Sequence, residues 1–327
     1  MKMKLIFLLV VTGSLLGSGI NNWVFGKETA FPTKPIEFYC PWGPGGAVSN
    51  AGRVVAKTLS EIIKNPVVVI HKTGGGGSVA ASYVAKSKPD GYTLLISNTA
   101  SNGIIPSIRM VEYKNADFEH LGLYLTQGLG LAVRSDAPWR TLKELVADAK
   151  KEPGKLKFSS SGIGTSSHFG VELLKIAAGG LKIGHVAFKS GPEGVAALLG
   201  DHVHMTFMYV VDLKGSLEAG TLRMLATGTE ERMEDYPNIP TFAESGYPEV
   251  KIVSWHGLSA PIGLAKNVSD KLKDAIYKTI KHPDAKKGLR QLGYFPTFKG
   301  SEEYTEFIKE EEKKYQMIAK EAGIKID

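Results

Sequence analysis

Apolar residues occur along the chain in short runs that alternate with stretches of helical spacing. The runs 36–40, 67–70 and 92–96 are bounded by Gly, Pro, Asn or Asp, and each predicts a strand. Apolar side chains at helical spacing predict a helix over 54–63 after the first run and another over 78–86 after the second. Strand–helix–strand units of this kind build parallel sheets covered by helices.

The second half of the chain carries further signals of the same kind. Thr141 to Glu144 and Thr241 to Glu244 have the Thr-x-x-Glu form of a capping box, and each predicts the start of a helix. A run over 155–159 leads into a Ser/Gly turn and a predicted helix near 169–178. A further helix is expected from Pro192 to Gly200, followed by a strand over 202–208. The last predicted helix has an apolar stripe between Tyr304 and Ile318. The alternation predicts an α/β fold with a mostly parallel sheet.

The first residues have the layout of a secretory signal peptide. Lys2 and Lys4 precede an apolar run from Leu5 to Leu16, which small and polar residues follow. A membrane-spanning helix needs about 20 apolar residues, so the shorter run predicts a leader cleaved after Gly26 rather than an uncleaved anchor. The mature chain is therefore expected to be exported and soluble.

The charge of the chain is mildly positive. Its formal net charge is +7 at pH 7, and removing Lys2 and Lys4 makes it +5. The basic residues are interleaved with acidic ones, as in residues 310–314, which argues against a nucleic-acid-binding stripe. A positive bias of this size gives weak support to a small anionic ligand.

Four turns rich in small, hydrogen-bonding residues follow the predicted strands. They are 41–49, 97–99, 159–168 and 188–192. Ligands of open α/β sheets bind beyond the carboxyl ends of the strands, where glycines let the backbone approach closely. The start of a helix offers unpaired N–H groups and a partial positive charge, so such turns can bind an anion without a charged side chain. Together they predict a site for a carboxylate or a phosphate.

Each of these features also has a purely structural interpretation. Gly/Ser turns commonly begin helices, and Gly74 to Gly77 is interpreted as a plain turn. His168 is either a ligand contact or a capping or core histidine. Trp42 and Trp255 can both be core aromatics, although Trp42 lies inside a loop and is the better candidate for a cavity wall. Lys189 is either a solvated charge or a group at the predicted crevice.

The spacings that mark common enzymes are absent from the sequence. It has no P-loop, no G-x-G-x-x-G after the first strand, no H-E-x-x-H, no paired C-x-x-C and no G-x-S-x-G. Ser166 and His168 are near neighbours, but a catalytic triad requires demonstrated roles and geometry. The one cysteine, Cys40, lies in a predicted strand, which favours a buried, inert thiol. We expect no cofactor, no metal and no catalysis; the alternative is an exported α/β hydrolase using Ser166 or Cys40.

Six segments, taken in order and spacing, resemble a known family. They are 39–46 with Arg53 beyond it, 89–94, 160–168, 185–191, 240–246 and 255–261. Over almost its entire mature length the chain resembles the substrate-binding receptors of tripartite tricarboxylate transporters (TTT), also called Bug or TctC proteins. Each segment alone is a weak signal, and their combination is specific.

The resemblance implies a two-lobed periplasmic binding protein fold (type II) that closes on its ligand about a hinge. Each lobe would be a mixed, mostly parallel sheet flanked by helices. Lobe 1 would comprise residues 27–127 and 249–327, lobe 2 would comprise 128–248, and 1–26 would be the signal peptide. The ligand cleft would lie between the lobes.

The resemblance also implies a function and partners. The receptor would capture a small organic carboxylate in the periplasm, either a di- or tricarboxylate or an aromatic carboxylate. It would deliver this ligand to an integral-membrane TTT permease of one large and one small subunit, as a monomer that binds no nucleic acid. A receptor that feeds a signalling partner instead remains an alternative.

The family's carboxylate site, carried over to this sequence, draws on both lobes. Lobe 1 would contribute Trp42, Gly45, Gly46 and Ser49, with Ser97, Asn98 and Thr99 nearby. Lobe 2 would contribute Ser161, Gly164, Thr165, Ser166 and His168, with Lys189 and Met208 or Tyr209 at the far end.

Three positions depart from the common family pattern. Where members commonly carry Asp, this chain has Ser49, which cannot pair with an ammonium group. The hypothesis is therefore a ligand other than an amino acid. Cys40 and Trp42 also replace commoner residues, and the Trp42 ring favours a bulkier or aromatic carboxylate through stacking.

Overall fold

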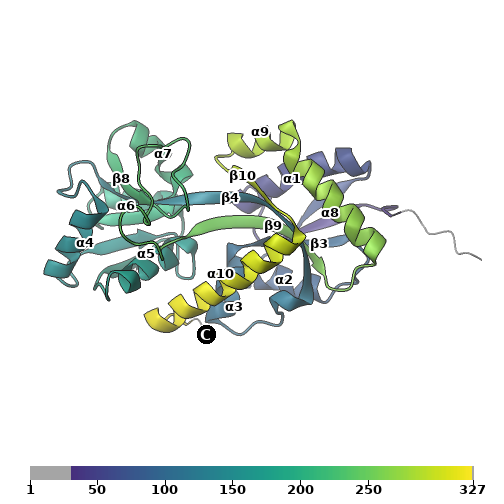
Figure 1. Ribbon diagram of the computed structural model, residues 1–327, viewed down its shortest axis with the longest axis horizontal. Helices are drawn as coiled ribbons and strands as arrows, with labels where there is room; N and C mark the ends of the chain where they lie inside the picture. The colour runs from purple at the N-terminus through teal and green to yellow at the C-terminus, as the bar shows by residue number, and fades with distance from the viewer. Residues whose placement is uncertain (1–30, 326–327) are drawn as a thin grey trace, which may run out of the picture. The chain divides into compact units, whose positions relative to one another are not determined.

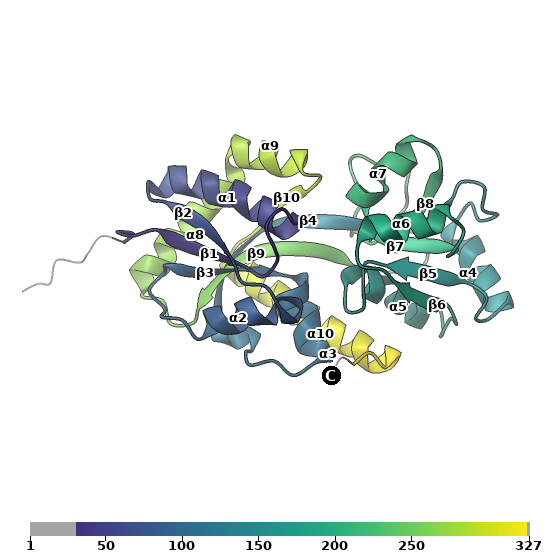
Figure 2. The ribbon, with the colours of Figure 1, turned by 180° about the vertical axis from the view of Figure 1, so that it is seen from behind.

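The computed structural model describes residues 31–325, so the predicted signal peptide over 1–26 lies outside the described residues. The fold described below is that of the unit that begins at Pro32. Its strands form one continuous sheet in the order β2-β1-β3-β9-β4-β7-β5-β6, with β8 and β10 each paired to β4 (Figures 1 and 2).

The first group of strands is parallel and matches the prediction. β1 (Ile36–Cys40) lies between β2 (Val67–His71) and β3 (Thr93–Asn98) and pairs with both in parallel. Between them the chain forms α1 (Ala47–Ile63) and α2 (Ser78–Ala85). The predicted strand–helix alternation is therefore confirmed, and α1 begins seven residues before the apolar pattern at Val54.

Two long strands connect the first group to the second. β4 (Phe118–Arg134) has 17 residues, and β9 (Val253–Pro261) runs antiparallel beside it (Figures 1 and 2). The first part of β4 also pairs with β10 (Phe295–Lys299). The apolar pattern did not predict these strands, because β4 and β9 are buried along almost their whole length and lack the polar–apolar alternation of a half-exposed strand.

The second group of strands repeats the parallel arrangement. β5 (Lys157–Ser160) pairs in parallel with β6 (Gly184–Ala187) and with β7 (Met205–Tyr209). β7 and β8 (Leu222–Thr227) join the last part of β4 as antiparallel partners. The α/β class with a mixed sheet is confirmed, and the antiparallel pairs of the described residues all involve β4 or β9.

The remaining helices cover the two groups of strands. They are α3 (Ile105–Ile108), α4 (Leu142–Lys151), α5 (Ser166–Ala177), α6 (Gly191–Leu199), α7 (Val210–Glu218), α8 (Lys266–Lys281), α9 (Pro283–Gln291) and α10 (Ser301–Ala322). α10 runs along both groups and contacts β4, α3 and α5 (Figure 2). Within residues 31–325, every helix is too short or too polar to span a lipid bilayer.

Three predicted element boundaries require correction. The Thr241 capping box forms both reciprocal hydrogen bonds with Glu244, at 2.8 and 3.1 Å, but a turn follows instead of a helix. The reason is Gly246, whose φ of +95° ends the helical path two residues later. α5 begins at Ser166, three residues before the predicted start, and β7 begins at Met205 because 201–204 form a turn.

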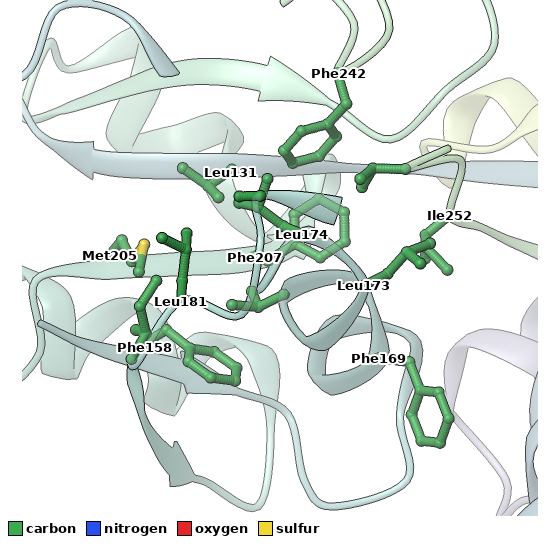
Figure 3. Close-up of a cluster of buried hydrophobic side chains, with 14 of the residues drawn as sticks. Leu131, Phe158, Phe169, Leu173, Leu174, Leu181, Met205, Phe207, Phe242 and Ile252 are labelled. Atoms are coloured by element: carbon green, nitrogen blue, oxygen red, sulfur yellow. The ribbon is translucent and has the colours of Figure 1, made fainter. Parts of the chain in front are cut away.

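A hydrophobic core fixes α5 against the second group of strands. Phe158, Phe169, Phe207 and Phe242 are fully or almost fully buried in this cluster (Figure 3). A Cβ atom at Gly170 of α5 would lie 2.1 Å from the Phe207 ring, so only glycine permits the close approach of α5 to β7. The N-terminus of α5 is therefore held in a defined position beside β7.

Candidate functional site

A cavity of about 320 Å³ lies where the two groups of strands meet. It is lined by the loops before α1 and α5, by the segment after β3 and by side chains of β4 and β9. This volume suits a small organic molecule. Three of the four predicted Gly/Ser turns contribute to it, and the turn at 188–192 does not.

The loop before α1 forms one wall of the cavity. Gly45 has φ of +81°, and the Asn50 side-chain amide donates a hydrogen bond to its carbonyl oxygen at 2.9 Å, which holds the loop in place. Gly46 is the N-cap of α1, and no side chain accepts a hydrogen bond from the first turn. Gly46, Ala47 and Trp42 all line the cavity, so the free N–H groups of the first turn of α1 lie at its edge.

The loop before α5 forms the opposite wall. Thr165 is the N-cap, and its hydroxyl accepts from the His168 N–H at 3.4 Å and donates to the Gly162 carbonyl oxygen at 2.7 Å. Gly164 has φ of +76°, a conformation that favours glycine. Gly164, Thr165 and Ser166 line the cavity. Two helix N-termini from different strand groups therefore border one space, and each favours an anion.

The segment after β3 contributes hydrogen-bonding groups, some of which are already bonded within the protein. The Asn98 side-chain oxygen accepts from the N–H groups of Ala100 at 3.0 Å and Ser101 at 3.2 Å, and so caps the short π-helical segment Thr99–Ile104. The Thr99 hydroxyl accepts from the Trp255 N–H at 2.8 Å. This segment is therefore tied to β9, and its donors are less available to a ligand than those of α1.

Side chains of the two connecting strands form the floor of the cavity. Gln127 of β4 lies opposite Ser254 of β9, and His256 of β9 lies opposite Asn98 of β3. Tyr209, at the end of β7, completes this polar surface. Gln127, Ser254 and His256 were not predicted, because the apolar pattern did not identify the strands that carry them.

The cavity is electrically neutral in its side chains. Among the described residues, its lining includes no Lys, Arg, Asp or Glu. Burial lowers the pKa of His256 to about 3, so its imidazole is neutral at pH 7. The groups in the lining that favour an anion are therefore the backbone dipoles at the helix starts.

Eight of the fifteen predicted site residues line this cavity. They are Trp42, Gly46, Asn98, Thr99, Gly164, Thr165, Ser166 and Tyr209. Gly76 also lines it, so the run Gly74 to Gly77, interpreted from the sequence as a plain turn, borders the cavity as well. Whether these residues bind a ligand stays a prediction.

Two predicted residues of the first group are buried away from the cavity. Ser49 has no exposed surface, and its hydroxyl is 2.8 Å from Nε2 of His71 on β2. Ser97 is equally buried and bonds to the Tyr304 hydroxyl of α10 at 3.0 Å. Because Ser49 faces β2, the inference that its lack of charge disfavours an amino acid has no structural basis.

The remaining predicted residues lie outside the cavity lining. His168 accepts the Gly164 N–H at its Nδ1 at 3.3 Å, so it braces the loop before α5. Ser161 bonds to Ser167 at 2.9 Å, and Met208 is packed in a hydrophobic cluster. Gly45 shapes the loop before α1, and the Lys189 N–H bonds to the Glu193 carboxylate at 3.2 Å in the outer turn before α6.

His168 and His185 form a stacked, neutral pair behind the α5 loop. Their ring centroids are 4.0 Å apart, and Nε2 of His185 is 2.6 Å from the Ser160 hydroxyl. Burial, followed by the neighbouring His185 and Lys175, lowers the pKa of His168 to about 3. Burial and Lys175 lower the pKa of His185 to about 4. The pair is therefore uncharged at neutral pH.

This pair predicts a loss of stability in mild acid. Histidine in an unfolded chain has a pKa near 6.5, so below that pH the unfolded chain binds protons that the folded pair does not bind. The stabilisation is complete above about pH 6.5 and falls as the pH drops toward 4 and 3. Replacing His185 with Phe should keep a stacked ring and give a shallower fall in the free energy of unfolding, measured by urea denaturation from pH 7 to pH 4.5. Equal slopes for the two proteins would contradict this account.

Two further features concern metal binding and thiol chemistry in the described part of the chain. Residues 31–325 contain no cluster of His, Cys, Asp or Glu that could hold a metal ion. Cys40 is fully buried, and burial raises the pKa of its thiol despite the opposing effect of Arg53. A thiol held in its protonated form is a poor nucleophile.

Comparisons with known proteins agree with this architecture. The family described as "Tripartite tricarboxylate transporter family receptor" matches residues 51–324. A UPF0065 protein from the tcbD-tcbE intergenic region of Pseudomonas sp. (strain P51) is 32% identical over 314 residues, covering 94% of this chain and 92% of that protein.

Solved structures show the same similarity. One, described as a periplasmic transporter, has 32% identity and a TM-score of 0.75, covering 91% of this chain and all (100%) of that one. Another, R. palustris Rpa4515 with adipate, has 28% identity and a TM-score of 0.75, covering 90% and 99% of the two chains. The chain belongs to the tripartite tricarboxylate transporter family of receptors, the Bug proteins.

Proposed function

We propose that this protein is an extracytoplasmic receptor that binds one small organic carboxylate in the cavity between the two groups of strands. The observation that carries the proposal is the convergence of the α1 and α5 N-termini on a cavity lined by neutral side chains. Backbone N–H groups at two helix starts can hold a carboxylate without a cationic side chain. The hydroxyls of Thr165 and Ser166 add donors beside them.

The family supports the wider role. A receptor of a tripartite transporter would deliver its ligand to an integral-membrane permease. We propose a permease of one large and one small subunit as the partner. Export through the predicted signal peptide would place the protein in the periplasm, where it would act as a monomer. The relative solved with adipate supports a carboxylate as the ligand class.

We propose that the two groups of strands are lobes that close about β4 and β9. The lobes would be residues 27–127 with 249–327, and residues 128–248. In support, β4 changes its partners near this boundary: Phe118–Gly128 pairs with β9, and Leu129–Arg134 pairs with β7 or β8. A ligand bound between the lobes would stabilise the closed form.

Binding without turnover is favoured over the hydrolase alternative. His168, the nearest histidine to Ser166 in sequence, stacks on His185 and uses Nδ1 to accept the Gly164 N–H. It is thus occupied as a structural group rather than placed as a general base. Cys40, the other candidate nucleophile, is buried with a raised pKa.

The experiment is calorimetric titration of the mature chain with succinate, adipate, citrate, benzoate and aspartate, each paired with a thermal melt. The proposal predicts saturable binding of at least one carboxylate with one site per chain. The melting temperature should rise with ligand concentration by mass action. If no carboxylate binds, or if Ser166→Ala or Cys40→Ala abolishes the formation of a product, the receptor proposal is wrong.

A further inference from the structure

The cavity can neutralise one carboxylate. The uncapped α1 and the start of α5 supply its backbone donors, each helix N-terminus being equivalent to roughly half a positive charge. Two donors after β3, the N–H groups of Ala100 and Ser101, are already used by the Asn98 side chain. A second carboxylate elsewhere in the cavity would meet no cation in the lining, and a buried charge that only neutral groups face is costly.

A negative charge acts on one residue of the cavity wall. Asp212 of α7 interacts electrostatically with Tyr209, which lines the cavity. Burial raises the pKa of Asp212 to about 6, so its carboxylate is largely ionised at pH 7.5. An anionic group that reached Tyr209 would be repelled by this charge.

Part of the cavity wall is apolar. Val48, Ile104, Ile105 and Ile163 line it, together with the ring of Trp42. Trp42 and Ile163 keep 38% and 59% of their surface exposed, so apolar area is available to a ligand. This wall suits a hydrocarbon body behind the carboxylate.

The floor holds two polar side chains that lack partners within the protein. His256 is 3% exposed, and within residues 31–325 neither of its ring nitrogens has a hydrogen-bond partner. Its Nδ1 is fully buried, so Nε2 is the ring nitrogen that a ligand in the cavity can reach. Gln127 is 4% exposed, and within residues 31–325 its side-chain amide has no hydrogen-bond partner. Polar groups in so buried a place are costly when left unpaired, so a ligand group that pairs with Nε2 of His256 or with the Gln127 amide gains affinity.

We propose that the ligand is a monocarboxylate with an apolar body and one neutral hydrogen-bonding group, a hydroxyl or a carbonyl, that reaches Gln127 and His256. This inference rests on the proposed function and narrows it. A neutral imidazole and an amide each offer a donor and an acceptor, which a hydroxyl or a carbonyl can match without adding charge. Gln127 and His256 would set the specificity of the receptor.

The test is calorimetric titration of the mature chain at pH 7.5 with ligands that differ in one terminal group. Hexanoate, 6-hydroxyhexanoate and adipate end in a methyl, a hydroxyl and a carboxylate, and the butanoate and octanoate series repeat the comparison at other lengths. The hydroxyl should improve affinity over the methyl by about tenfold in the best-fitting series, and the second carboxylate should bind more weakly than the hydroxyl.

Two substitutions test whether Gln127 and His256, in the floor of the cavity, cause the preference for the hydroxyl. In Gln127→Leu and in His256→Phe the ratio of hydroxyl to methyl affinity should fall from about ten toward one. Gln316→Leu makes the same chemical change on the exposed face of α10 and should keep the ratio. A ratio that survives in both floor variants would overturn the assignment.

The outcomes separate this inference from the proposed function. Carboxylates that bind with no advantage for the hydroxyl, or with the dicarboxylate tightest in every series, would overturn the inference and leave the receptor function standing. A wild-type protein that binds no carboxylate at all would overturn both.

Discussion

Replacing Ala47 with aspartate is expected to weaken carboxylate binding by roughly a hundredfold while leaving the fold at least as stable. Ala47 is the first residue of α1, is exposed and lines the cavity. An aspartate there would place a carboxylate where we propose that the carboxylate of the ligand binds. It would also complement the N–H groups of an uncapped helix start, which contributes about 0.3–1 kcal/mol to stability.

The substitution should therefore lower the affinity for the ligand while raising the free energy of unfolding. Two carboxylates about 5 Å apart repel each other by about 3 kcal/mol at the effective dielectric constant of a partly buried site. That repulsion corresponds to roughly a hundredfold loss of affinity. Calorimetric titration measures the affinity, and urea denaturation without ligand measures the free energy of unfolding.

Two variants serve as controls for the Ala47 substitution. Ala47→Asn has the same shape without the charge and should lose much less affinity. Ala265, the N-cap of α8, also lacks a capping side chain and lies outside the cavity lining, so Ala265→Asp should stabilise the protein and preserve binding. Retention of full affinity in Ala47→Asp would contradict the placement of the ligand at the start of α1.

The largest loss of stability is expected from replacing Trp255 with alanine. Trp255 of β9 is fully buried, and its ring packs edge-on against Tyr304 and Phe307 of α10 at 5.7 and 5.6 Å. Its Nε1–H donates to the buried Glu311 carboxylate at 2.9 Å. Truncation would open a large cavity and remove a hydrogen bond from a buried acid, at a cost of about 3–5 kcal/mol.

Trp42 is the matched control, because the same substitution there should affect binding rather than folding. It is 38% exposed and lines the cavity, so Trp42→Ala should change the free energy of unfolding by less than about 1 kcal/mol. Its affinity for a carboxylate with an apolar body should fall by about tenfold. Guanidinium denaturation and calorimetry of both variants measure the two effects. A large loss of stability in Trp42→Ala with a small one in Trp255→Ala would contradict this account.

The sequence predicted the parallel parts of the fold because those strands end in turn residues and are followed by amphipathic helices. β1, β2 and β3 with α1 and α2 have these signals. β4 and β9 do not: both of their faces are buried, and polar residues such as Gln127, Ser254 and His256 lie within them, so neither strand shows a clear apolar period. The connection between the strand groups depends on long-range pairing, which local patterns do not specify.

The site residues that local sequence signals predicted differ in the same way from those that they did not. Trp42, Gly46, Thr165 and Ser166 were predicted because helix starts have a local signature, and all line the cavity. The positions of Ser49, Ser97 and Met208 depend instead on which way a side chain points after the turn, and each points into packed structure. The polar floor on β4 and β9 has no local signature, because its residues are separated by more than a hundred positions in sequence.

The Thr241 capping box forms the contacts that the sequence predicted, but the helix that it predicted does not form. Both predicted hydrogen bonds with Glu244 form. The chain nevertheless turns away at Gly246, because a helix requires several further residues of helical conformation and the glycine adopts a positive φ. A cap orders the first turn but does not by itself extend a helix.

The central claim, capture of a carboxylate without catalysis, is tested most directly by the fate of a bound ligand. The mature chain is saturated with the tightest carboxylate of the calorimetric panel, carrying ¹³C at the carboxyl carbon, then freed of excess ligand by gel filtration and followed by NMR. The account predicts one equivalent retained with a shifted carboxyl resonance and, after denaturation, release of the same compound unchanged. Failure to retain any carboxylate, or recovery of a converted product, would contradict it.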